Sequence, residues 1–117
     1  MVKIFYTGFK YDVQPFIDRI QVVIGKLPDD IQQKIHKGCM IFIIDNCYGY
    51  YINNPQNNII LLNAIQIKND CLSLKDQDYI IAHEFAHFIL NHVKSSIKGE
   101  KEANILVDHW GFSKELQ

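Results

Sequence analysis

The sequence is poor in arginine and has no long hydrophobic run. Arg19 is the only arginine among twelve basic residues, and the net charge is -1. Because specific contacts to guanine and phosphate depend largely on the bidentate geometry of arginine, a nucleic-acid partner is disfavoured. The longest uninterrupted apolar stretch, Cys39–Ile44, is far shorter than the roughly 20 residues that cross a bilayer. The sequence therefore predicts neither a nucleic-acid-binding surface nor a membrane span.

The sequence is also poor in cysteine. Cys39, Cys47 and Cys71 are an odd number and form no C-x-x-C pair. This pattern favours free thiols in a reducing compartment over a disulfide framework. Residues 1–8 lack the long apolar core of a secretory signal peptide. We therefore expect a cytoplasmic protein.

What the chain does have is enough apolar sequence for one folded domain. It has 117 residues, of which 48% are hydrophobic. This length lies in the usual range of roughly 100–150 residues for a domain. No internal repeat, low-complexity tract or Gly/Ser linker divides it, so a single domain over residues 1–117 is expected.

The N-terminal half alternates helix and strand signals. Apolar residues recur at helical spacing over residues 16–27, and Pro28 predicts the end of this helix. A second short helix is expected from Asp29 or Asp30 to His36, before Gly38. Short apolar runs predict strands, with a polar hairpin loop before the last of them, at residues 2–6, 40–44, 50–52 and 59–62. They indicate a small sheet that is mostly antiparallel.

The C-terminal part is predicted to form two helices. Ser73, with Asp76 three positions later, resembles a capping box that opens a long helix. A break is expected over residues 95–99, followed by a last helix over about 99–110 with Gly111 as its stop. The expected fold class is α+β, with N-terminal helices packed on a small sheet and two helices following it.

The pattern H-E-x-x-H occurs at residues 83–87, within the predicted long helix. Helical residues four apart lie one turn apart and roughly 40° around the axis, so His83 and His87 can bind one ion. Zinc accepts imidazole nitrogens, and a catalytic zinc keeps one position for water. Glu84 can take a proton from that water. We predict one zinc ion per chain, in preference to two histidines on a partly exposed helix without a metal.

A third ligand is expected downstream of the motif. The candidates are His92, Glu100, Glu102, Asp108 and His109. Because His92 follows His83 by nine residues, it is expected to point to the opposite side of the same helix. Glu100 falls on the inward face of the last helix, whereas Glu102 is out of that register and expected in solvent. Glu100 is therefore favoured, with Asp108 or His109 as the alternatives.

Two further polar residues follow Glu100 at steps of four. Asn104 and Asp108 form a polar ridge beside the apolar stripe of the last helix. Histidine ligands need acceptors for their free N–H groups. Asn104 and Asp108 are suited to accept these hydrogen bonds.

Residues 83–92, HEFAHFILNH, and residues 100–104, EKEAN, resemble the gluzincin branch of zinc metallopeptidases. The similarity is greatest to the ImmA/IrrE-type peptidases of phages, mobile elements and bacteria. The resemblance covers about residues 76–111 and implies a minimal zincin-like fold. It implies zinc ligation by His83, His87 and Glu100, with Glu84 as general base and proton shuttle. It also implies that Asn104 supports a ligand through a hydrogen bond.

We therefore expect a hydrolase, a zinc-dependent metallopeptidase that cleaves peptide bonds of a cytoplasmic protein. The peptide is expected to add to an exposed strand edge at residues 59–62. Candidate donors to the developing oxyanion are Tyr50, Tyr51, Tyr79 and His109. The alternative is a catalytically weak or inactive zincin scaffold that acts as a protein-binding module. The sequence has no G-x-S-x-G motif, which a serine hydrolase would need, and no Gly-rich phosphate-binding loop, which a nucleotide-dependent enzyme would need.

Overall fold

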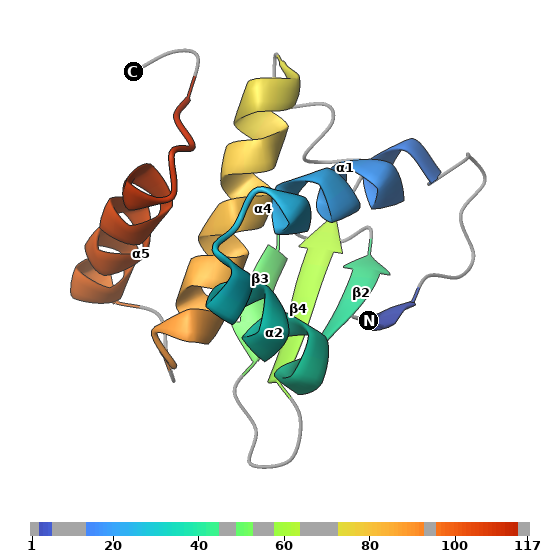
Figure 1. Ribbon diagram of the computed structural model, residues 1–117. Coiled ribbons are helices and arrows are strands. Elements are labelled where there is room, and N and C mark those ends of the chain that lie inside the picture. Colours follow the sequence, from blue (N-terminus) through green and yellow to red (C-terminus); the bar gives the residue numbers. More distant parts are fainter. Residues whose placement is uncertain are drawn as a thin grey trace.

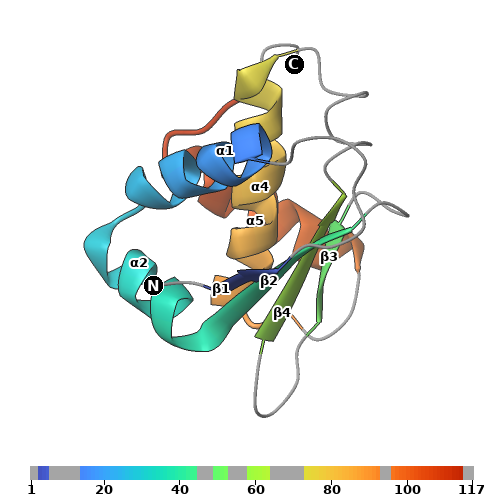
Figure 2. The same cartoon turned by 90° about the vertical axis from the view of Figure 1, so that its right-hand side faces the viewer.

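A mixed sheet carries helices on one of its faces (Figures 1 and 2). The computed structural model describes residues 3–5, 14–44, 49–52, 58–63, 73–92 and 96–114. In chain order the elements are β1 (Lys3–Phe5), α1 (Gln14–Gly25), α2 (Asp29–Gly38), β2 (Cys39–Ile44), β3 (Gly49–Ile52), β4 (Asn58–Asn63), α4 (Leu74–Ile89) and α5 (Ile97–His109). Each predicted helix and strand has a counterpart, and the α+β class is confirmed.

The relative direction of the strands differs from the prediction. The sheet has the order β1-β2-β4-β3, in which β1 and β2, and likewise β2 and β4, pair in parallel, and only β3 and β4 are antiparallel. The prediction of a mostly antiparallel sheet is therefore wrong. Between β1 and β2 the chain forms two helices, and such crossovers join parallel strands. The two six-residue strands β2 and β4 then pair along their whole length, which places β3 at the edge.

The position of β4 also corrects the expected substrate edge. Residues 59–62 lie in β4, which is paired with β2 on one side and β3 on the other. Among the described strands, the edges belong to β1 and β3. The expected hairpin pairing of β3 with β4 is found, and the polar loop at residues 53–57 lies outside the described residues.

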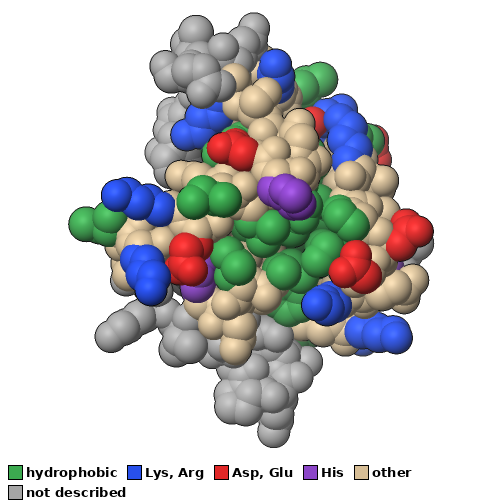
Figure 3. All heavy atoms as spheres, turned by 60° about the vertical axis from the view of Figure 1, so that its left-hand side comes forward, with side chains coloured by type: hydrophobic (Ala, Val, Ile, Leu, Met, Phe, Trp, Pro, Cys, Tyr) green, Lys and Arg blue, Asp and Glu red, His purple; other side chains and the backbone are tan. Residues whose placement is uncertain are grey.

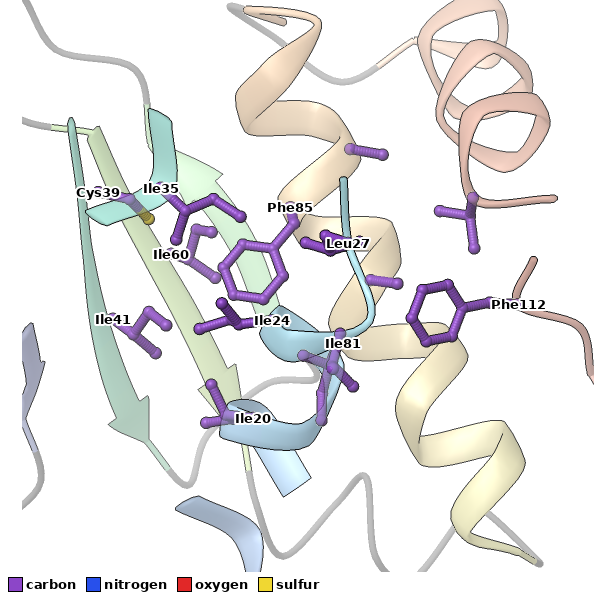
Figure 4. Packing of buried hydrophobic residues seen from close by; sticks show 14 of the residues in the cluster. Ile20, Ile24, Leu27, Ile35, Cys39, Ile41, Ile60, Ile81, Phe85 and Phe112 are labelled. Atoms are coloured by element: carbon purple, nitrogen blue, oxygen red, sulfur yellow. The ribbon is translucent and has the colours of Figure 1, made fainter. Parts of the chain in front are cut away.

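The core lies between the sheet and the helices α1, α2 and α4 (Figure 4). Phe85 and Ile81 of α4 are fully buried against Ile20 of α1 and against Ile41 and Ile60 of the sheet. Burying a side chain of this size stabilises the fold by about 1.5–3 kcal/mol. This packing fixes α4 along one face and leaves another face of the helix for α5.

An ion pair joins α1 to α4 at the border of this core. The Nε of Arg19 donates to Oδ1 of Asp78 at 3.0 Å, and its Nη2 contacts Oδ2. Asp78 is buried, whereas Arg19 is about a quarter exposed. The only arginine of the sequence therefore neutralises a buried carboxylate.

Helix α5 packs on the outer side of α4 (Figure 1). It buries Ala103 and Val107. Figure 3 turns the side of the molecule that carries α5 towards the viewer, and on this surface hydrophobic side chains lie at the centre with charged side chains around them. The Ser96 hydroxyl accepts a hydrogen bond from the N–H of Gly99 at 2.9 Å. Because this cap starts the helix at Ile97, the predicted break over residues 95–99 extends too far.

No helix in the described segments combines the length and apolar character needed to cross a membrane.

Cys39, at the start of β2, provides a test of the core. Only 6% of the residue is exposed, and burial raises the pKa of its thiol to about 12. Since the thiolate is the reactive form, N-ethylmaleimide at pH 8 should modify Cys39 only in the unfolded chain. Burial of the neutral thiol contributes fully to stability below the unfolded pKa of 9.0 and less as the pH rises towards 12. Peptide mapping after labelling with and without urea measures this protection, and equal labelling rates would contradict it.

Candidate metal centre

The two histidines of the motif lie in the C-terminal half of a well-capped helix. Ser73 is the N-cap of α4, and its hydroxyl accepts a hydrogen bond from the N–H of Asp76 at 3.2 Å, as predicted. The helix continues for 16 residues through His83 and His87. The imidazole positions are therefore set by regular helical geometry on a backbone that the core holds.

Glu100, in the first turn of α5, meets both histidines. The Nε2 atoms of His83 and His87 are 3.0 Å apart. Oε2 of Glu100 lies 2.8 Å from His83 Nε2, and its Oε1 lies 3.3 Å from His87 Nε2. Two ligand atoms on a tetrahedral zinc with bonds of 2.0–2.1 Å are about 3.3 Å apart. The three side chains therefore present a triangle of nearly the right size for one ion.

The chemistry of this donor set also fits zinc. Two imidazole nitrogens and one carboxylate are a known ligand set of catalytic zinc sites, which leave a further position open. Burial, followed by the charge of His83, lowers the pKa of His87. A lowered pKa favours the neutral imidazole, whose lone pair can bind a metal. Among the described residues, His83, His87 and Glu100 are the group whose atoms lie close enough to hold an ion.

Asn104 supports the first histidine. The Nδ1–H of His83 donates to Oδ1 of Asn104 at 2.9 Å, and the hydroxyl of Tyr79 donates to the same oxygen at 3.3 Å. With its Nδ1 bearing the hydrogen, His83 has its Nε2 lone pair directed towards Glu100 and His87. Asp108 interacts with Tyr79: burial, followed by the charge and the hydrogen bond of Asp108, raises the pKa of the Tyr79 hydroxyl.

His92 is the residue whose position was predicted wrongly. It does not continue α4, because the helix ends at Ile89 and Asn91 adopts the left-handed conformation with φ 57°. The chain therefore turns back, and the Nδ1 of His92 lies 2.7 Å from the Nδ1 of His87. The local signal was available in the sequence, since asparagine often ends a helix in this conformation.

Glu84 is buried beside the triangle. Only 8% of the residue is exposed. Burial, followed by the charge of Glu100, raises the pKa of Glu84 to about 8. A cation held by the neighbouring ligands would oppose this shift. Glu84 is thus a buried carboxyl group with a raised pKa, next in sequence to the first histidine of the motif.

A cleft of about 230 Å³ opens next to these ligands. It is lined by Tyr79, Ile80, His83, Glu100, Asn104 and Lys114. Lys114 extends over the ring of Tyr79, with Nζ 5.1 Å from its centre. His83 and Glu100 are therefore part of the wall of a small open cleft.

The remaining sequence candidates are distributed as follows. Asp108 and His109 are exposed near the C-terminal end of α5 and do not join the ligand triangle. Of the proposed oxyanion donors, Tyr79 borders the cleft, but its hydroxyl is engaged by Asn104. The side chains of Tyr50 and Tyr51 lie outside what the structure describes.

Comparison with known proteins identifies no family for this chain. No protein-family model matches the chain, and no curated protein and no solved structure matches it either. The similarity to gluzincins therefore depends on the motif residues alone.

Proposed function

We propose that this protein is a zinc-dependent metallopeptidase of gluzincin type, similar to the ImmA/IrrE-type enzymes, acting on a cytoplasmic protein. In this proposal His83, His87 and Glu100 hold one zinc ion per chain, and Glu84 is the general base. The observation that supports it most directly is the approach of three side chains from two helices: the Nε2 atoms of His83 and His87 lie 3.0 Å apart, and the two carboxylate oxygens of Glu100 lie 2.8 Å and 3.3 Å from them. The spacing within α4 accounts for only two of them.

When bound, the zinc would polarise the substrate carbonyl and lower the pKa of a water molecule. The chain's own contribution is the Glu84 carboxylate, which accepts one proton from the attacking water. The water oxygen forms a bond to the carbonyl carbon, the carbon–nitrogen bond breaks, and Glu84 returns the proton to the leaving amine. Asn104 keeps the His83 ring in its orientation throughout.

The substrate is proposed to lie along β3. This strand pairs with β4 and is at the edge of the described sheet, and α4 packs against it. An exposed edge can receive an extended peptide as an additional strand through main-chain hydrogen bonds. The edge and the ligand triangle would then contact the same segment of substrate.

Zinc content and cleavage together test this function. We expect one equivalent of zinc by elemental analysis of the purified protein, and loss of most of it in His87→Ala. The zinc-loaded protein should produce new peptide N-termini from a mixture of unfolded proteins, detected by mass spectrometry, and a zinc chelator should stop this. The matched control is His109→Gln, since His109 is exposed and outside the triangle.

Two results would contradict the proposal. A wild-type protein that stays free of metal in excess zinc would remove the site. Zinc binding without any cleavage would instead favour the alternative, a protein-binding module built on the same scaffold.

A further inference from the structure

We propose that His92 and Glu102 form an outer pair that orients the imidazole of His87 for metal binding, an inference that rests on the proposed zinc site. Neither residue belongs to the ligand triangle. Both lie on the side of His87 that faces away from it. His92 and Glu102 are therefore positioning residues that act through His87.

The contacts form a chain of three side chains. The Nδ1 of His87 lies 2.7 Å from the Nδ1 of His92, and the two ring centres are 5.0 Å apart at an interplanar angle of 63°. On its other side, the Nε2 of His92 lies 3.5 Å from Oε1 of Glu102. The His92 side chain is 17% exposed, so most of it is shielded from water that could replace these partners.

The fold builds this contact with its backbone. The N–H of His92 donates to the carbonyl oxygen of His87 at 3.1 Å, and the N–H of Asn91 donates to that of Phe88 at 3.1 Å. Together with the left-handed Asn91, these bonds form a Schellman motif. The turn that ends α4 therefore holds His92 directly beside the second histidine of the motif.

The first turn of α5 packs beside the same ring. Gly99 is buried in this turn, between the N-cap and Glu100. A Cβ atom at Gly99 would be in ordinary van der Waals contact with Cε1 and Nδ1 of His92, at 3.5 Å, and in a tight contact with the Ser96 hydroxyl oxygen, at 3.0 Å. The start of α5 thus places Glu100 beside His87 and Glu102 beside His92.

Only one arrangement of hydrogens satisfies all the contacts when Nε2 of His87 is a metal ligand. The Nδ1 of a neutral His87 then carries the hydrogen, and it can donate only to an acceptor. His92 must therefore offer the lone pair of its Nδ1 and carry its own hydrogen on Nε2, which points towards the Glu102 carboxylate. Acceptors of this kind fix the tautomer of a metal-binding histidine and raise its basicity.

The main alternative is that His92 only fills space, and two substitutions separate the roles. His92→Phe keeps the ring shape but removes the acceptor, leaving the Nδ1–H of His87 without its partner. His92→Asn loses most of the ring but places an amide oxygen where Nδ1 lies. An acceptor role predicts that asparagine is the better substitute, and a packing role predicts phenylalanine.

The experiment measures zinc affinity by competition with a chromophoric chelator, together with the visible absorption of the cobalt(II)-loaded protein. We expect His92→Phe to weaken zinc binding by about 10- to 100-fold, as for other outer partners of metal ligands. His92→Asn should retain most of the affinity, and Glu102→Gln should cause a smaller loss. The cobalt absorption should change in His92→Phe and return towards wild type in His92→Asn. His109→Gln and Asp30→Asn are controls of matched chemistry on exposed residues.

The outcomes distinguish this inference from the function on which it rests. If wild-type protein binds zinc and cleaves peptides while His92→Phe binds zinc as tightly as His92→Asn, only the outer pair is wrong. A larger loss in asparagine than in phenylalanine would also overturn it, in favour of packing. If the wild type binds zinc without cleavage, the affinity order still decides the role of His92 although the peptidase has failed. Absence of zinc binding by the wild type would overturn both.

Discussion

Replacing Glu84 by glutamine is expected to reduce peptide cleavage by about 10²- to 10⁴-fold while zinc binding persists, the range for loss of a general base. Glutamine has the same shape but cannot accept the proton of the attacking water. Because Glu84 lies outside the ligand triangle, its replacement removes no metal ligand. Measuring turnover at saturating substrate and zinc content on the same preparation tests both parts.

The Glu84→Gln variant also discriminates between the two candidate functions. Its matched control is Asp30→Asn, which removes a carboxylate from the exposed side of α2 and should leave turnover unchanged. Cleavage by Glu84→Gln at the wild-type rate would exclude the proposed mechanism. The glutamine should also relieve the cost of burying a carboxylate beside Glu100, so the metal-free protein should not be destabilised.

Replacing Arg19 by alanine is expected to lower the free energy of unfolding by about 3 kcal/mol, the lower end for breaking a buried ion pair. This is a large fraction of the roughly 5–15 kcal/mol that stabilises a typical domain. The reason is that Asp78, with 7% of its side chain exposed, would lose the guanidinium that pairs with it. Urea unfolding followed by circular dichroism measures the difference.

Three further variants locate the source of this cost. Asp78→Ala should cost less than Arg19→Ala, because the arginine left behind is partly exposed and can be hydrated. Lys26→Ala should cost under about 1 kcal/mol, since its ammonium lies 3.9 Å from the same carboxylate and is largely exposed. The double variant Arg19→Met with Asp78→Leu should recover part of the loss. Equal costs for Arg19→Ala and Lys26→Ala would refute this account.

Features that depend on one helix alone could be predicted from the sequence. The spacing of His83 and His87 is a property of any α-helix, and the caps at Ser73 and Gly111 depend on a few adjacent residues. The periodicity of α5 also pointed Glu100 inward, where the structure brings it to the two histidines. The prediction for His92 failed at the helix end, because extending the period past Ile89 ignored the left-handed turn at Asn91.

Features that join separate parts of the chain could not be predicted in this way. Arg19 and Asp78 are 59 positions apart, and no local pattern connects them. The sequence predicted a mostly antiparallel sheet, whereas β2 pairs in parallel with β4 and β3 lies at the edge. Which strands pair depends on how well two distant apolar faces pack under the same helices.

The amino-acid sequence by itself determined the helices and strands, the pair of imidazoles one turn apart and the inward direction of Glu100. The tertiary structure alone decided the order of the strands, the ion pair between α1 and α4 and the contact of His92 with Glu102. The physical reason is that side-chain periodicity specifies which face of an element is buried, whereas the partner of that face depends on the packing of elements distant in the chain.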